Sequence, residues 1–412
     1  MHKKTTFPAI IISMFIIISF GVISLSHVLS NKPLLFLNYK TYGLDYNDFF
    51  KASKRIIDGQ SPYDFPSNRY VTTPIPAIAN IVFVPMGFYK ARILFYFLIP
   101  LSLIAGYQLI TSMFDFAGED KKIILTAGIV ALLFGYPFYF LVQRENIDGW
   151  VFLFLSLGLY WLYKPKKELF SSFFFSLAIV FKIYPALIIL PILLNKKWRL
   201  LFWIGLWLAL WGAITLLWFS DFRTALSMRS QSFFRFDENG SLIATIDLFT
   251  ILIASLGIPV PATTIIKYSP TAAFLIYVLL ISSVFFADYK TSKTTNFEIT
   301  SYLLYLPFMI VFPKVIYHYS LIICLLLIPA LSHLWKTSET RPQKGLIFII
   351  TIGVALTQWQ TVATYKLTDN IVSHIIPGFG LLMVLIGIAI YKIYELSLAQ
   401  DKITAEVSAI PS

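Results

Sequence analysis

Long apolar segments, separated by short charged loops, recur along nearly the whole chain. A helix that crosses the hydrocarbon core of a bilayer needs about 20 apolar residues. The pattern predicts an all-α polytopic membrane protein with about twelve transmembrane helices, within a range of roughly ten to thirteen. The predicted spans cover residues 7–29, 92–114, 122–142, 149–163, 169–181, 184–194, 200–220, 270–287, 299–312, 316–334, 345–363 and 371–394.

Basic residues gather in four of the loops between apolar segments, which places those loops in the cytoplasm by the positive-inside tendency. The clusters are Lys164, Lys166 and Lys167; Lys196, Lys197 and Arg199; Lys290 and Lys293; and Lys336, Arg341 and Lys344. We therefore expect both termini to be cytoplasmic in a cell inner (plasma) membrane, with one transmembrane domain over residues 1–394. Residues 395–412 read as a polar cytoplasmic tail.

Two further apolar segments, residues 73–88 and 242–257, would invert this alternation if they crossed the membrane. The first contains three prolines and the second contains Asp247. Both features favour re-entrant or interfacial segments on the outer face.

The composition supports the membrane assignment and excludes other classes. Hydrophobic residues make up 58% of the 412 residues and charged residues only 13%, against about 25% in soluble domains. The net charge of +12 lies in the loops rather than in one basic domain, so we expect no nucleic-acid partner. Cys324 is the single cysteine, which excludes disulfides and thiolate metal sites, and no spacing of His and carboxylates demands a metal. No cofactor is therefore expected.

The first outer loop, residues 30–73, is much longer than ordinary connections between helices. Residues 43–59 within it read as a short amphipathic juxtamembrane helix. Asp45 and Asp48 lie three residues apart near its start, where they share one face. They can cap the helix, or a carboxylate there can act as a general base toward a sugar hydroxyl.

The outer ends of two later spans carry concentrated polar groups. The segment QRENID at 143–148 contains Arg144, Asn146 and Asp148, and reads either as a satisfied polar turn or as a ligand site. Lys182 lies between two apolar runs with no acidic neighbour in sequence. Such a cation can meet a phosphate, or its long side chain can simply reach the interface.

Two more outer segments carry candidate binding groups. The segment PKVIYHY at 313–319 supplies Lys314, His318 and Tyr319, groups that can stabilise charge on a departing phosphate. The loop at 221–241 combines arginines and aromatic residues with Asn239 and Ser241. Aromatic and hydrogen-bonding groups together suit a pyranose, although aromatic belts at membrane interfaces have the same composition.

These segments, taken in order, resemble glycosyltransferase family 87, a branch of the GT-C membrane glycosyltransferases. The segment DYNDFFKAS from Asp45, followed by Pro62 and Tyr63, is similar to the first-loop motif of the family. QRENIDG and FKIYPA, the latter containing Tyr184, are similar to its Glu-Arg-Gly-Asn turn and its Lys-x-Tyr-Pro segment, and NGSL at 239–242 and PKVIYHY resemble two further elements. Gln143 and Glu145 depart from the family pattern, which has Glu and Gly there, and TPIP at 73–76 replaces a Tyr-Pro-Pro.

The resemblance implies a GT-C fold and a catalytic base at Asp45, with Asp48 as the second candidate. It implies transfer of a hexose, often mannose, from a polyprenyl-phosphate sugar to a lipid or surface-glycan acceptor, with inversion. In this interpretation Lys182, Arg144, His318 and Lys314 bind the donor phosphate. The expected substrate-binding residues are Asn146, Asp148, Tyr184, Tyr63, Asn239, Ser241 and Tyr319. The alternatives are a flippase or transporter of lipid-linked sugars and a membrane scaffold that only binds the carrier.

Overall fold

The computed structural model describes residues 6–29, 44–63, 70, 72–231, 242–291, 298–311, 318–359 and 371–408. All regular elements in these ranges are helices, which confirms the all-α prediction. They are α1 (Phe7–Leu29), α2 (Leu44–Ile57), α3 (Pro74–Asn80), η3 (Ile81–Met86), α4 (Phe88–Thr111), α5 (Gly118–Phe134), α6 (Tyr136–Arg144), α7 (Asp148–Leu162), α8 (Glu168–Phe181), η4 (Tyr184–Ile188), α9 (Ile189–Leu194), α10 (Trp198–Leu216), α11 (Phe219–Gln231), α12 (Leu242–Ser255), α13 (Ala262–Thr291), α14 (Ile299–Leu304), α15 (Leu306–Val311), η6 (His318–Leu326), α16 (Leu327–Thr337), α17 (Arg341–Thr357) and α18 (Ile371–Ser408).

Within the described residues, five helical stretches are long and apolar enough to cross a membrane, or up to six if a bent pair counts as one span. The five are Phe88–Thr111, Trp198–Leu216, Ala262–Thr291, Ser320–Thr337 and Ile375–Asp401. Shorter apolar helices, among them α7 and α8, account for most of the other predicted spans. The chain is thus multi-helical and membrane-compatible, while the count of twelve stays a prediction.

The predicted span at 122–142 is divided into α5 and α6, which meet at an angle of 54°. Gly135 ends α5, and Pro137 in the first turn of α6 has no backbone N–H to continue the hydrogen-bond ladder. The Tyr136 N–H instead donates to the carbonyl of Gln358, 3.3 Å away. A Cβ at Gly135 would lie 2.8 Å from Oε1 of Gln358 and 2.9 Å from the backbone oxygen of Ala131, and the backbone atom cannot move aside as a side-chain end can. The bend directs the end of α6 toward α2.

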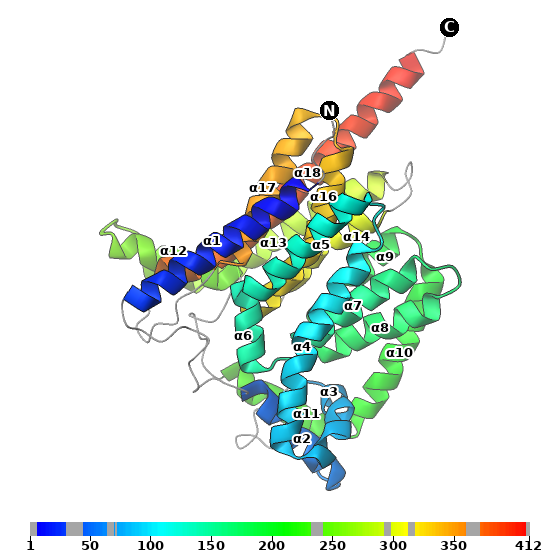
Figure 1. The fold of residues 1–412 in the computed structure, drawn as a ribbon, viewed down its shortest axis with the longest axis vertical. Coiled ribbons are helices and arrows are strands. Elements are labelled where there is room, and N and C mark those ends of the chain that lie inside the picture. Colours follow the sequence, from blue (N-terminus) through cyan, green and yellow to red (C-terminus); the bar gives the residue numbers. More distant parts are fainter. Residues whose placement is uncertain are drawn as a thin grey trace.

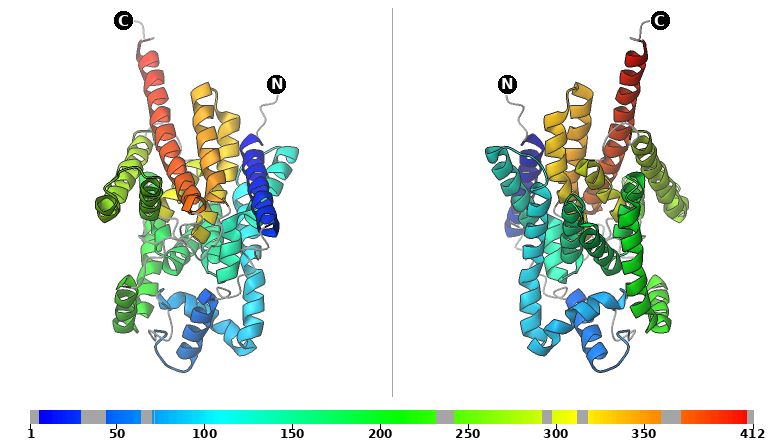
Figure 2. Two further views of the ribbon diagram at one scale, coloured as in Figure 1. Left: turned by 90° about the vertical axis from the view of Figure 1, so that its left-hand side faces the viewer. Right: turned by 90° about the vertical axis from the view of Figure 1, so that its right-hand side faces the viewer.

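Helix α2 lies within the range 43–59 that the sequence predicts as helical, and the left-handed Gly59 (φ 70°) follows it. Its apolar face is turned toward protein: the Tyr46 ring lies 4.8 Å from that of Phe95 on α4. Ser53 donates a hydrogen bond to the carbonyl of Ala77 on α3 at 2.8 Å. In Figures 1 and 2, α2 and α3 form the lower end of the molecule, below the main bundle. Helices α3 and η3, which form most of the apolar segment 73–88, pack against α2 at this end.

The C-terminal helices pack closely through small residues. A Cβ at Gly380 of α18 would lie 2.8 Å from the carbonyl oxygen of Gly353 on α17, so the two backbones nearly touch. Close approach through glycine is the usual way that membrane helices gain dispersion contacts. Figure 1 shows α17 and α18 side by side at the upper end, with α18 continuing into the predicted tail through Ser408.

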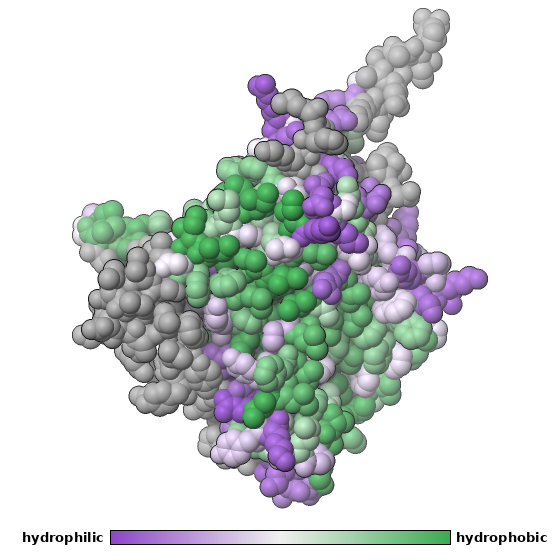
Figure 3. Space-filling view, in the orientation of Figure 1, coloured by the Kyte–Doolittle hydropathy of each residue, from purple (hydrophilic) through white to green (hydrophobic). Residues whose placement is uncertain are grey.

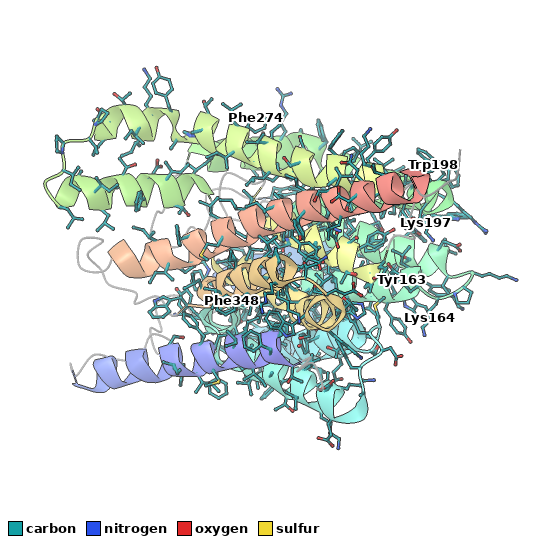
Figure 4. All side chains as sticks on the ribbon, turned by 90° about the horizontal axis from the view of Figure 1, so that it is seen from above. Tyr163, Lys164, Lys197, Trp198, Phe274 and Phe348 are labelled. Atoms are coloured by element: carbon teal, nitrogen blue, oxygen red, sulfur yellow. The ribbon has the colours of Figure 1, made fainter. Side chains whose placement is uncertain are left out.

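Basic and aromatic residues mark the end of the bundle away from α2. Figure 4 shows Lys164, Lys197, Tyr163 and Trp198 toward one end of the bundle, as seen from above. Figure 3 shows an apolar band across the molecule, with hydrophilic residues gathered at its upper right and at its lower end. An apolar band between two polar ends is the pattern of a bilayer-embedded protein.

Near the basic end, Lys392 of α18 is buried in a cluster of polar groups from neighbouring helices. Its ammonium group lies 3.1 Å from Asp288 of α13 and 3.0 Å from Glu395. It also lies 3.3 Å from the Ser301 hydroxyl on α14. Lys392 is 6% exposed and Asp288 2%, so each charge depends on the other for stabilisation.

We expect Lys392→Met to destabilise the protein by about 3–5 kcal/mol, because it leaves the buried Asp288 carboxylate without its cation. The measurement is the apparent melting temperature of purified protein in detergent. Lys197→Met, at an exposed lysine, serves as the control and should melt like the wild type. Equal melting temperatures for the two variants would contradict the expectation.

Candidate functional site

The start of α2 meets the turn between α6 and α7 at the side chain of Asp45. Arg144 donates from Nη2 to Asp45 Oδ1 at 2.9 Å. Asn146 donates from Nδ2 to Asp45 Oδ2 at 2.5 Å. About one hundred residues of chain separate the partners, so the fold brings together three of the residues that the sequence predicts for one site.

The local backbone explains how Arg144 and Asn146 are presented. The N–H of Asn146 donates to the carbonyl of Leu141 at 3.1 Å, and Glu145 adopts a left-handed conformation with φ 53° and ψ 50°. A hydrogen bond that spans five residues around a left-handed residue is the Schellman motif, which ends a helix. The left-handed position in this motif is normally glycine. The turn reverses the chain between α6 and α7 and leaves both donors facing α2.

Asn146 links Asp45 to a second carboxylate. Its Oδ1 accepts the backbone N–H of Asp148 at 3.0 Å, so its amide nitrogen must face Asp45. Asp148 is the first residue of α7, where the helix dipole favours a carboxylate. Its side chain is fully buried. The two aspartates are therefore joined through one amide group.

Side chains near α8 and from η6 contact Asp148. The Lys182 ammonium at the end of α8 lies 3.5 Å from Asp148 Oδ1, and the Ser320 hydroxyl of η6 donates to Oδ2 at 2.5 Å. The Tyr184 hydroxyl, at the start of η4, lies beside both Asp148 and Ser320. Lys182 and Tyr184 thus join the predicted site. Ser320 was not predicted, because a serine inside an apolar run carries no signal in the sequence.

Glu145 forms a third ion pair on the other side of the turn. Its Oε1 lies 2.7 Å from Nε of Arg92 on α4. Burial raises the pKa of the Glu145 carboxyl from its ordinary value, the Arg92 guanidinium opposes that shift, and the nearby Asp45 adds to it. Neither residue was predicted as part of the site. The departure of Glu145 from the family pattern was the available signal.

The described cluster is balanced in charge. Asp45, Glu145 and Asp148 are each paired with one cation, respectively Arg144, Arg92 and Lys182. Arg144 and Lys182 keep 11% and 23% of their side-chain surface exposed. Arg92 keeps 28%, so all three cations of the cluster are partly exposed.

Other predicted residues lie apart from the cluster or outside the described ranges. The Tyr63 hydroxyl donates to the Thr72 carbonyl at 2.8 Å, and its ring packs against Tyr70 and Phe222. Asp48 lies one helical turn beyond Asp45 on α2. His318 and Tyr319 begin η6, but their side chains are not described, and Lys314, Asn239 and Ser241 lie outside the described residues. Their predicted roles stay predictions.

A search of the described residues finds no group of three or more His, Cys, Asp and Glu side chains arranged to hold a metal ion.

Residues 71–313, more than half of the chain, match the family model of glycosyltransferase family 87. A search of the curated proteins finds no match. The matched range contains Arg144, Asn146, Asp148, Lys182 and Tyr184, whereas Asp45 precedes it and is connected to it by the contacts to Arg144 and Asn146.

The raised pKa of Glu145 predicts a pH-dependent difference in stability between the wild type and Glu145→Gln. A carboxyl whose folded pKa exceeds its unfolded value stabilises the fold fully below the unfolded pKa, near the ordinary value of 4.5. That contribution is lost as the pH rises through the folded pKa. We therefore expect the melting temperature of the wild type to fall relative to that of the variant as the pH rises from about 4.5.

The measurement is the melting temperature of both proteins in one detergent across this pH range. Glu119→Gln, at a carboxylate that is 85% exposed, is the matched control and should show a constant difference from the wild type. A constant difference for Glu145→Gln as well would refute the assignment of a raised pKa.

Proposed function

Since the chain belongs to glycosyltransferase family 87, we propose that it transfers a hexose, with mannose as the first candidate, from a polyprenyl-phosphate sugar to a lipid or cell-surface glycan acceptor. The single observation that supports this most is the contact of Asp45 with Arg144 and Asn146. It joins a carboxylate suited to general-base catalysis to a cation, Arg144, that is suited to a phosphate. Transfer of a sugar from a phosphate leaving group requires both.

In this proposal Asp45 removes the proton from the acceptor hydroxyl. Both of its oxygens already accept a hydrogen bond, but each carboxylate oxygen has two lone-pair sites, so a hydroxyl can still donate to it. The acceptor oxygen then attacks the anomeric carbon as the bond from that carbon to the phosphate oxygen breaks. Attack opposite to the leaving group inverts the anomeric configuration.

The paired charges of the site suit this reaction. As Asp45 takes the proton it becomes neutral, and an additional negative charge appears on the departing polyprenyl phosphate. Arg144, which is paired with Asp45 before the reaction, can then follow the charge to the phosphate. Lys182 meets the phosphate from the end of α8 in this proposal, and His318 and Lys314 are proposed to join them from residues 313–319.

The position of the site supports catalysis at the outer face of the cell membrane. Helix α2, which carries Asp45 in its first turn, lies at the lower end of the molecule in Figure 1, whereas the N-terminal end of α1 and the connection between α16 and α17 lie at the upper end. By the positive-inside tendency the basic loops belong to the cytoplasm. The donor is then a lipid-linked sugar that is available on that outer side.

The first test is sugar transfer from synthetic polyprenyl-phosphate mannose and glucose to a total membrane lipid extract. Asp45→Asn should reduce the rate by roughly 10²–10⁴-fold, because it removes the proton acceptor. Asp58→Asn, at an exposed aspartate that follows α2, is the matched control and should transfer normally. Normal transfer by Asp45→Asn would exclude Asp45 as the base. No transfer by wild-type protein that still binds the carrier would favour a flippase or a scaffold.

The second test addresses the donor phosphate. Lys182→Gln should weaken binding of polyprenyl phosphate by roughly 10–100-fold, because it removes a charged hydrogen-bond donor. Binding is measured with the purified protein and polyprenyl phosphate in detergent. Because Lys182→Gln also leaves the buried Asp148 without its cation, the double variant Lys182→Gln with Asp148→Asn provides a folded comparison. Lys182→Arg should retain binding, and unchanged affinity in the double variant would contradict the role of Lys182.

A further inference from the structure

Glu145 occupies a backbone conformation that glycine normally fills. Its φ of 53° lies in the left-handed region, which costs a residue with a side chain on the order of 1 kcal/mol or more. The family pattern that the segment resembles has glycine at this position. A glutamate kept in such a conformation requires a compensating interaction or a function.

The side chain of Glu145 is buried, and of its two carboxylate oxygens only one has a partner in the described part of the chain. Its Oε1 pairs with Arg92 at 2.7 Å, and its side chain is 2% exposed. Its second oxygen, Oε2, is buried and has no hydrogen-bond partner among the residues that the structure describes. Burying a charged oxygen without a donor is costly, so this carboxylate is not explained by stability alone.

Glu145 also lies close enough to α2 to act on it electrostatically. Its negative charge lies near enough to the carboxylate of Asp45, at the start of that helix, for the two to repel each other. Two cations pair with these carboxylates from the elements around the turn: Arg92 of α4 pairs with Glu145, and Arg144 of α6 pairs with Asp45. The neighbouring α3 and η3 segments contain no charged residue.

We infer that Glu145 is a positioning residue for the Asp45 site: anchored by Arg92, it fixes the turn that carries Arg144 and Asn146 and places a second negative charge beside Asp45. Where the family pattern has glycine, the pair of Glu145 and Arg92 thus both holds the turn and adds a negative charge next to the proposed base. This inference rests on the proposed role of Asp45.

The test is the pH profile of kcat for sugar transfer from the same synthetic mannose and glucose donors. Glu145→Gln removes a negative charge from the neighbourhood of the reacting groups, so the acid limb of the activity profile should move to lower pH by about one unit. Glu145→Gly should give the same shift, because it also removes the charge while relieving the backbone strain. Arg92→Gln should move the limb to higher pH, because it removes a positive charge from the same neighbourhood.

The controls separate this inference from the proposed function. Glu119→Gln removes an exposed carboxylate on α5 and should leave the profile unchanged. Full activity in Asp45→Asn would overturn the proposed function itself. If Asp45→Asn is inactive but the Glu145 variants keep the wild-type profile, only the positioning role is overturned. The positioning role is also overturned if the Glu145 variants lose transfer equally at every pH and the acid limb stays where it is. That result would mean that Glu145 only supports folding, because less folded enzyme lowers the rate without changing its pH dependence.

Discussion

Asp45 is held by two donors from a turn that lies about one hundred residues further along the chain, and the candidate site depends on that contact. The Arg144 and Asn146 side chains bind opposite oxygens of the carboxylate. Because Asn146 also accepts the N–H of Asp148, the same amide orders the start of α7. Loss of this contact would separate the first outer loop from the helices that carry the other charged groups.

Two backbone features make the contact possible. The bend at Gly135 directs α6 toward α2, and the left-handed residue at position 145 turns the chain so that both donors face Asp45. Each feature relies on a contact from a distant helix, Gln358 for the bend and Arg92 for the turn. The geometry of the site is therefore set by packing between helices as much as by the loop that carries the aspartate.

The site keeps its charges at the ends of helices, where they can be paired. A charge in the hydrocarbon core is expensive unless it has a partner, and each carboxylate of the cluster has a cation close by. A balanced site can accept a phosphate only if some of these pairs open. In the proposed reaction, proton transfer to Asp45 would open its pair with Arg144 and release that cation.

The sequence predicted the all-helical class and a helix near residues 43–59, because apolar periodicity is written in consecutive residues. Its local motifs also singled out Asp45, Arg144, Asn146, Asp148, Lys182 and Tyr184, which the structure brings together. The roles of these residues stay predictions. The division of the segment 122–142 at Gly135, the burial of the apolar face of α2 against protein, and the contribution of Ser320 depended on contacts between distant segments, which no local pattern encodes. The roles of Glu145 and Arg92 were equally hidden, since an ion pair forms only where the fold brings both side chains to one place. The sequence thus determined which residue types stand at the helix ends, and the tertiary structure decided which of them meet.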